Sequence, residues 1–124
     1  MGSSTPIDGE AGSAMKMLVA IISNERLDEV REALLGAEVA HMTVSRVTGH
    51  GRLRDAEIYR GVEFVPDLTP KIRVELVVPT GRVEAVIKTI VESVRDDHGD
   101  AKIFVLAIED VVRVRTGERG IDAL

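Results

Sequence analysis

The pattern of apolar and polar residues along the chain alternates between the runs typical of strands and the spacing typical of amphipathic helices. A continuous apolar run covers residues 17–22, and residues 102–108 form a second run that is apolar on both faces. The alternating segment 42–47 and the stretch 70–78 fit two further strands, since strand side chains point to opposite faces in turn. The pattern therefore predicts four strands.

Two amphipathic helices are predicted between these strands. Ser23 and Asn24 offer a cap for the first helix, and Pro79, Thr80 and Gly81 turn the chain into the second. The apolar stripe of the first helix consists of Leu27, Val30, Leu34 and Ala37, and that of the second consists of Val83, Val86, Ile87, Ile90, Val91 and Val94. The order βαββαβ predicts an α+β, ferredoxin-like fold with a four-stranded antiparallel sheet.

Such a sheet leaves one face without helices. The first and fourth strands are nevertheless apolar on both faces. Because no further element is available to cover the second face, we expect the chain to form a homo-oligomer.

A long polar segment, from Gly49 to Lys71, joins the second and third strands. It is rich in arginine and has neither helical nor alternating periodicity. Loops of this length are functional far more often than loops of ordinary length, so we expect this segment to carry function and the rest of the fold to hold it.

Composition excludes several classes of protein. The 124 residues suffice for one domain, with a net charge of −5, two Phe, one Tyr, no Trp and no Cys. Neither the charge nor the few aromatic residues suit nucleic-acid binding, and no apolar run reaches the length that a membrane span needs. Residues 1–14 are small and polar, and we interpret them as a disordered leader or an expression tag that precedes a domain at 15–124. We expect a cytoplasmic protein without direct membrane insertion.

Three basic clusters lie near strand ends. The first is Gly49-His50-Gly51-Arg52, the second is Gly99-Asp100-Ala101-Lys102, and the third contains Arg113 and Arg115, which point the same way if their segment is extended. Each cluster alone is also what an ordinary turn or a solvated edge strand contains. If they converge across a subunit boundary, they form a pocket for a polyanionic small molecule, such as the phosphates of a nucleotide.

The sequence contains no recognisable catalytic constellation. The histidines His41, His50 and His98 lack the spacing of metal ligands, and neither a nucleophile with its base nor a P-loop is present. We therefore predict a protein that is not an enzyme and that has no metal site. A nucleotide-hydrolysing enzyme and a purely structural oligomer are the alternatives.

Residues 15–124 resemble the PII signal-transduction (nitrogen regulatory) family over nearly their whole length. The segments that carry the resemblance are residues 27–34, 42–44, 49–52, 59–64, 70–71, 99–105 and 113–118. The resemblance implies a homotrimer that binds adenine nucleotides (ATP, ADP or AMP) between subunits. It also implies a long loop between the second and third strands, the T-loop, that docks on a target transporter or metabolic enzyme.

The resemblance also assigns roles to residues. It implies that Thr43 and Val77 contact the adenosine part and that Lys71 pairs with a small-anion effector. The phosphates would meet Gly49, His50, Gly51 and Arg52, the B-loop residues Gly99, Asp100, Ala101 and Lys102, and Arg113 and Arg115 from the neighbouring chain. The partner-binding residues of the T-loop would be Arg54, Tyr59, Arg60 and Phe64.

Three departures from the family pattern bear on function. Leu53 stands where the family has a glutamine that helps to hold Mg²⁺ and 2-oxoglutarate, and a leucine has no oxygen for a hard cation. Phe64 and Val62 stand where relatives carry a uridylylated tyrosine and a phosphorylated serine. We therefore expect no uridylylation, little or no response to 2-oxoglutarate, and an open role for Mg²⁺. A carbon-related sensor that pairs a nucleotide with bicarbonate or another small anion, held by Arg52 and Lys71, is the alternative.

Overall fold

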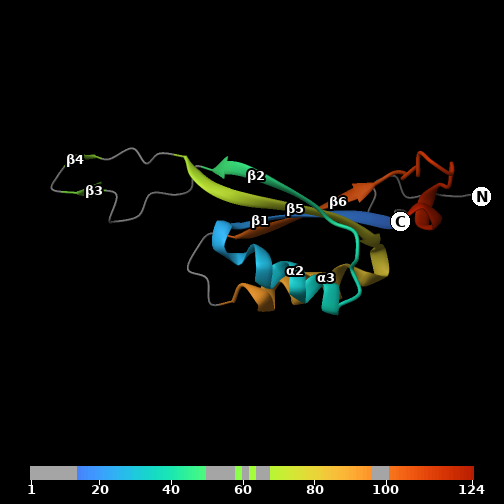
Figure 1. The fold of residues 1–124 in the computed structure, drawn as a ribbon, viewed down its shortest axis with the longest axis horizontal. Coiled ribbons are helices and arrows are strands. Elements are labelled where there is room, and N and C mark those ends of the chain that lie inside the picture. Colours follow the sequence, from blue (N-terminus) through green and yellow to red (C-terminus); the bar gives the residue numbers. More distant parts are fainter. Residues whose placement is uncertain (1–13, 50–57, 60–61, 64–67, 96–100) are drawn as a thin grey trace, which may run out of the picture.

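The computed structural model describes residues 14–49, 58–59, 62–63, 68–95 and 101–124 (Figure 1). The elements follow in the order β1 (Met15–Ser23), η1 (Asn24–Arg26), α2 (Leu27–Gly36), β2 (Thr43–Gly49), β3 (Ile58–Tyr59), β4 (Val62–Glu63), β5 (Thr69–Pro79), η3 (Thr80–Arg82), α3 (Val83–Ser93), β6 (Lys102–Ile108) and η4 (Gly120–Ala123). The predicted strands and helices are all present, and their bounds lie within two residues of the predicted ones.

The four long strands form one sheet in the spatial order β2-β5-β1-β6. Every neighbouring pair is antiparallel, with Ala20 of β1 opposite both Val74 of β5 and Ile103 of β6. The two strands that a helix connects are therefore not neighbours in the sheet: α2 joins β1 to β2, and α3 joins β5 to β6. This order confirms the predicted ferredoxin-like arrangement.

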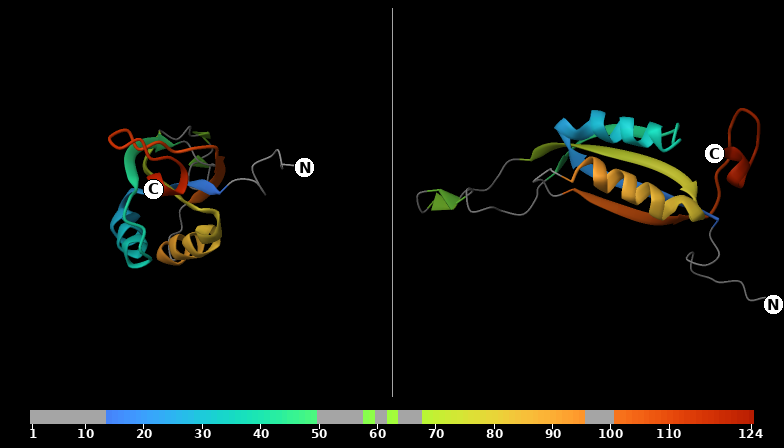
Figure 2. Two further views of the ribbon diagram at one scale, coloured as in Figure 1. Left: turned by 90° about the vertical axis from the view of Figure 1, so that its right-hand side faces the viewer. Right: turned by 90° about the horizontal axis from the view of Figure 1, so that it is seen from below.

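Both helices lie side by side on one face of the sheet (Figure 2). The side chains that meet between the two layers are fully buried. They include Leu18, Val30, Leu34, Val74 and Val86. Period 2 in β1 and β5 and period 3.6 in the helices bring these side chains together. None of the helices in the described parts of the chain is long and apolar enough to cross a membrane.

The other face of the sheet has no helix. The strand register puts Met17, Val77 and Leu106 in one row across this face, and Phe104 lies in the next row. Phe104 and Leu106 are 50% and 46% exposed in the single chain. The predicted uncovered apolar face is therefore present among the described residues.

One local expectation was wrong, and one local feature was not predicted. Ser23 does not cap α2; it precedes the 3-10 turn η1 and makes no side-chain cap hydrogen bond, while Arg26 occupies the N-cap position of α2. The long polar segment also contains a short antiparallel pair, β3 with β4. Strands of two residues are too short to leave an alternating pattern, so no periodicity predicted them.

Candidate functional site

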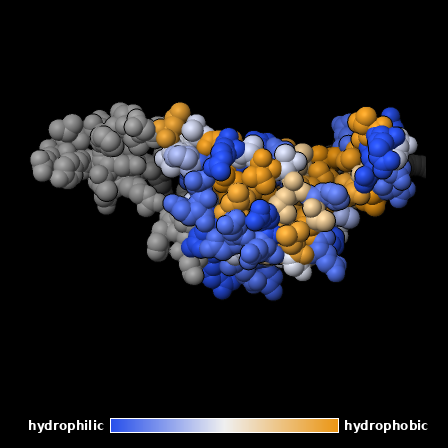
Figure 3. Space-filling view, viewed as in Figure 1, coloured by the Kyte–Doolittle hydropathy of each residue, from blue (hydrophilic) through white to orange (hydrophobic). Residues whose placement is uncertain are grey.

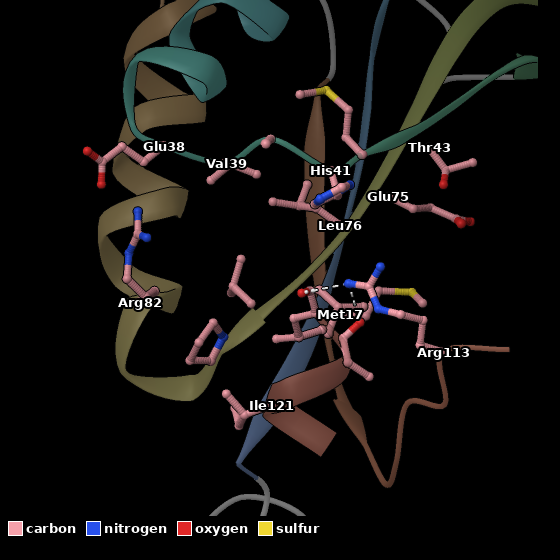
Figure 4. A pocket seen from close by; sticks show the side chains of 17 residues that line it. Met17, Glu38, Val39, His41, Thr43, Glu75, Leu76, Arg82, Arg113 and Ile121 are labelled. Carbon is pink, nitrogen blue, oxygen red and sulfur yellow. Dashed lines mark hydrogen bonds between the residues drawn. The ribbon is translucent and has the colours of Figure 1, made fainter. Parts of the chain in front are cut away.

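A cavity lies at the end of the sheet where β2 begins (Figure 4). It has a volume of about 710 Å³, within the range of small-molecule sites. Its lining comes from three parts of the chain, namely the α2–β2 connection, the second half of β5 and the C-terminal residues. In Figure 3, apolar surface fills the hollow where the C-terminal tail rises from the body of the molecule. We call this cavity the β5-edge pocket.

The strand register explains why a cavity forms here. β2 begins at Thr43, opposite Glu75, so β5 continues from Leu76 to Pro79 without a partner on that edge. The connection of residues 37–42 lies beside this unpaired edge. The pocket is therefore the space that a longer β2 would have filled.

The α2–β2 connection is fixed at its start. The backbone N–H of Val39 donates to the carbonyl of Leu34 at 2.9 Å, and Arg82 donates to the carbonyl of Ala37 at 2.7 Å. Between them, Glu38 has a φ of +67°, the left-handed conformation with which helices often end. These contacts hold the connection at the pocket, and Val39 itself is only 7% exposed.

Arg113 forms the opposite side of the pocket with the C-terminal residues. Its Nη2 donates to the main-chain oxygens of Ala123 and Leu124, at 3.3 and 3.2 Å. Its Nε lies 3.4 Å from the Oε1 of Glu118, and this nitrogen is buried without a hydrogen bond in the described structure. The guanidinium thus faces main-chain oxygens on one side and one carboxylate on the other.

The pocket combines an apolar floor with a few polar groups. Leu76 and Val78 are 3% and 4% exposed and supply the floor, while Thr43, His41 and Arg113 supply the polar groups around it. Figure 4 shows the His41 ring above Leu76 and the Arg113 guanidinium across from it. A pocket of this kind suits a flat, largely apolar group with a polar or anionic attachment.

The opposite end of the sheet contains a separate group of cations. Gly49 ends β2 beside Lys71, whose Cγ would lie 3.4 Å from a Cβ at that position, so the lysine stem packs against the glycine backbone. Lys102 begins β6 opposite Ile21, whose other neighbour is Arg73. Three cationic side chains therefore lie at this end of the sheet.

A second cavity of about 380 Å³ lies between α3 and the start of β6. Ala101 and Lys102 line it together with Arg95 and isoleucine and valine side chains. Two of the predicted B-loop residues therefore border this cavity.

The predicted site residues fall into two separate groups within one chain. Thr43, Val77 and Arg113 meet in the β5-edge pocket, whereas Gly49, Lys71 and Lys102 lie at the far end of the sheet. The predicted residues outside the described parts of the chain are His50, Gly51, Arg52, Arg54, Arg60, Phe64, Gly99 and Asp100. Of Tyr59, only its place in β3 is described.

The segment that carries Arg113 and Arg115 is not extended. The N–H of Gly117 donates to the carbonyl of Arg113 at 2.7 Å, and Val112 pairs with Arg119, so these residues form a tight hairpin. Gly117 permits the turn because its φ is +80°. The two arginines therefore do not share one environment, since Arg113 is half-buried and Arg115 is exposed.

Several pocket residues carried no sequence signal. His41 precedes β2 without a motif, and Arg82 contacts a main-chain carbonyl. The C-terminal lining residues lie in or directly after the short 3-10 turn η4 (Gly120–Ala123). Contacts of this kind depend on where the tail packs, which no local pattern encodes.

Asp110 fixes the base of the C-terminal hairpin. Its Oδ1 accepts hydrogen bonds from the N–H groups of Val111 and Gly120, at 2.8 and 3.2 Å, and its Oδ2 accepts one from Arg119 at 2.7 Å. The Val111 N–H contributes most to a lowered pKa of the Asp110 carboxyl, and Arg119 and Gly120 act in the same direction. The carboxylate therefore joins the two ends of the hairpin.

Comparisons with known proteins agree with this fold. The family model described as "Nitrogen regulatory protein P-II" matches residues 15–118. A nitrogen regulatory protein P-II of Rhodobacter capsulatus is 46% identical over 112 residues, which cover 89% of this chain and 100% of the relative. A nitrogen regulatory protein P-II 2 of Methanothermobacter thermautotrophicus is 47% identical over 112 residues, covering 89% of this chain and 97% of the relative.

A solved structure gives the same result. The crystal structure of Arabidopsis thaliana PII bound to citrate matches with a TM-score of 0.76 and 38% identity, over 94% of this chain and 98% of that chain. The relatives are named for regulation, which confirms the prediction of a regulatory protein that is not an enzyme. The chain belongs to the nitrogen regulatory protein P-II family.

Proposed function

We propose that this protein is a homotrimeric sensor that binds an adenine nucleotide between subunits and controls a target protein through its T-loop. The adenosine part would lie against Thr43 and Val77 in the β5-edge pocket. The phosphates would extend along β2 toward Gly49 and Lys102. β2 spans seven residues, which corresponds to a length of about 20 Å and leaves room for an elongated ligand.

The observation that supports this proposal most is the separation of the two groups. A half-apolar pocket lies at one end of β2, and Gly49, Lys71 and Lys102 lie at the other, so a ligand with an apolar head and an anionic tail can contact both. The hairpin with Arg113 and Arg115 lies at the pocket end of its own chain. It would reach the phosphates of a neighbouring copy, which the uncovered apolar face favours.

Nucleotide binding would act on the T-loop by population shift. A ligand that prefers one loop conformation raises the population of that conformation by the ratio of its two affinities. The partner surface would comprise Arg54, Tyr59, Arg60 and Phe64, in which the aromatic side chains are the anchors.

Isothermal titration calorimetry with ATP, ADP and AMP tests the proposal. We expect binding to the wild type and a loss of affinity of about tenfold or more in Lys102→Ala, because a charged hydrogen bond to phosphate contributes about 1.5–3 kcal/mol. Lys88→Ala is the matched control, since Lys88 is an exposed lysine on the outer side of α3. Absence of heat with all three nucleotides, or equal losses in both variants, would contradict the proposal.

A second effector site for a small anion is the other candidate. The Arabidopsis relative is described as bound to citrate, a small polyanion. In this chain Lys71 packs on Gly49 at the base of the T-loop, and Arg52 follows shortly after. Thermal-shift assays with bicarbonate, citrate and 2-oxoglutarate, each with and without Mg-ATP, test this idea. Leu53 leads us to expect no additional shift with 2-oxoglutarate.

A further inference from the structure

The C-terminal residues form one wall of the β5-edge pocket. Ile121, Ala123 and Leu124 line it, and the 3-10 turn of Gly120–Ala123 brings them there. Ala123 is 8% exposed, so the segment packs on the body of the protein. We call residues 121–124 the C-terminal latch.

In the part of the chain that the structure describes, Arg113 makes two side-chain hydrogen bonds to the latch. Both run from its Nη2 to main-chain oxygens, at 3.3 Å to that of Ala123 and 3.2 Å to that of Leu124, and Figure 4 draws them as dashed lines. These distances are at the long end of the range for N–H···O hydrogen bonds. The latch is therefore held to Arg113 by weak contacts.

The guanidinium of Arg113 is also incompletely satisfied. Its Nε is buried and has no hydrogen bond in the described structure, with the nearest carboxylate oxygen, that of Glu118, 3.4 Å away. A buried donor without an acceptor is unfavourable. Phosphate oxygens would form shorter, charge-assisted bonds and engage two nitrogens at once. A polyanion is thus a better partner for Arg113 than the latch is.

The base of the tail is fixed independently of Arg113. The N–H of Gly120 donates to the carbonyl of Val111 at 2.9 Å and to Asp110 at 3.2 Å. Gly120 separates the fixed hairpin from the latch. Its φ is +67°, a conformation that glycine adopts without strain. Release of Arg113 can therefore free residues 121–124 while the hairpin stays in place.

We propose that the latch is an internal competitor of the anionic ligand for Arg113. In the closed state the main-chain oxygens of Ala123 and Leu124 occupy the guanidinium. A phosphate group of a ligand on a neighbouring copy takes over Arg113 and displaces the latch. This inference rests on the proposed nucleotide binding and adds its regulation, because the latch competes for Arg113 with anions and not with neutral nucleosides.

A double-mutant cycle tests the competition. A variant that ends at Gly120 should bind ATP about fivefold more tightly than the full chain, the lower end of typical coupling between sites. In an Arg113→Ala background the same truncation should leave ATP affinity unchanged, because the shared partner is gone. Adenosine has no phosphate, so its affinity should not rise. Truncation that weakens ATP and adenosine alike would mean that the latch is only a binding wall.

A control substitution separates the side chains of the latch from its main-chain oxygens. Asp122→Ala removes the side chain of an exposed latch residue that does not line the pocket, and it leaves the oxygens of Ala123 and Leu124 in place. Its ATP affinity should equal that of the wild type. A gain equal to that of the truncated variant would contradict competition through the main chain.

Hydrogen exchange on the full chain tests the latch without truncation. The N–H of Leu124 donates to the carbonyl of Ile121 at 3.1 Å, and this bond should open when the latch leaves. We expect ATP or inorganic pyrophosphate to speed exchange at Leu124, with no change at Gly117 of the hairpin. If no nucleotide binds at all, the proposed function is wrong. The exchange rate at Leu124 with pyrophosphate then still tests whether an anion displaces the latch. Unchanged exchange at Leu124 under saturating pyrophosphate would overturn it.

Discussion

The two faces of the four-stranded sheet differ in how they are covered. On the helix-covered face, Leu18 and Val74 are fully buried within one chain. On the open face, Phe104 and Leu106 have comparable apolar side chains but remain about half exposed. The same strands contribute to both faces, so the difference arises from what lies above them. One face is completed by the chain itself, and the other is where we propose that a second copy binds.

The open face is not uniformly exposed. Val19 is 5% exposed because it lies on the central strand β1, between Phe104 of β6 and Glu75 of β5. Arg73 and Glu75 form an ion pair on this face. Among the described residues, the exposed large apolar side chains of this face, Phe104 and Leu106, lie on the outer strand β6, where we expect the contact with another copy to lie.

A matched pair of leucine substitutions compares the two faces directly. Leu18→Ala should lower the free energy of unfolding by about 3 kcal/mol or more, because it leaves a cavity among fully buried side chains. Leu106→Ala should cost less than about 1 kcal/mol in a dissociated chain, since Leu106 is already 46% exposed. Urea unfolding at several protein concentrations measures both values. A cost for Leu106→Ala that equals that of Leu18→Ala at high dilution would abolish the distinction between the faces.

A charge on the open face should interfere with association and not with folding. Phe104→Glu places a carboxylate where the proposed homotrimer buries an aromatic ring, which is unfavourable without a partner for the charge. We expect the mass measured by light scattering to fall from trimer to monomer while the circular dichroism spectrum is retained.

Glu32→Gln is the control for a change of charge alone. Glu32 is an exposed residue of α2 on the helix side of the molecule. The mass of the Glu32→Gln variant, measured by light scattering, should remain that of the wild type. An unchanged mass of Phe104→Glu would mean that the open face is not the contact surface.

The fold was predictable from the sequence because each element has a period of its own. Residues 102–108 were predicted with the bounds that β6 has, and the alternation of β5 gave the correct buried side, from Ile72 to Val78. The site was predictable only in part. Thr43, Val77 and Arg113 meet in one pocket, but their roles came from resemblance to the family and are untested.

The remainder of the site depends on contacts that are distant in the sequence. Arg113 and Arg115 would share a side in an extended segment, and the Gly117 turn instead separates a half-buried side chain from an exposed one. The Arg113 contact with Leu124 also depends on how the tail folds back. Such packing leaves no periodic pattern in the chain.

The α2–β2 connection, at the edge between the two faces, should accept a stabilising glycine. Glu38 has a φ of +67°, which costs an L-residue about 1–2 kcal/mol, whereas glycine adopts it freely. Glu38→Gly should therefore raise the free energy of unfolding by about 0.5–1 kcal/mol after the added chain entropy of glycine is subtracted. Thermal unfolding measures the change.

Ala37→Gly is the matched control for this substitution. Ala37 precedes Glu38 and has a φ of −92°, which any residue adopts. Glycine at that position brings only the entropy cost and should lower stability. Equal effects of the two substitutions would show that the left-handed conformation carries no strain.

The smallest effect concerns the tail beside the open face and depends on pH. The lowered pKa of Asp110 means that its carboxylate form stabilises the folded tail. This contribution is fully present above the unfolded pKa of about 3.9 and is lost as the pH falls through the lower pKa of the folded state. At pH 7, Asp110→Asn should therefore unfold at a slightly lower urea concentration than the wild type. This difference between the two midpoints should disappear toward pH 2. Asp122→Asn, which changes an exposed aspartate of η4, should show no such dependence. A difference for Asp110→Asn that grows on acidification would have the wrong sign for a carboxylate that is stabilised in the fold, and would remove Asp110 as the residue that fixes the tail.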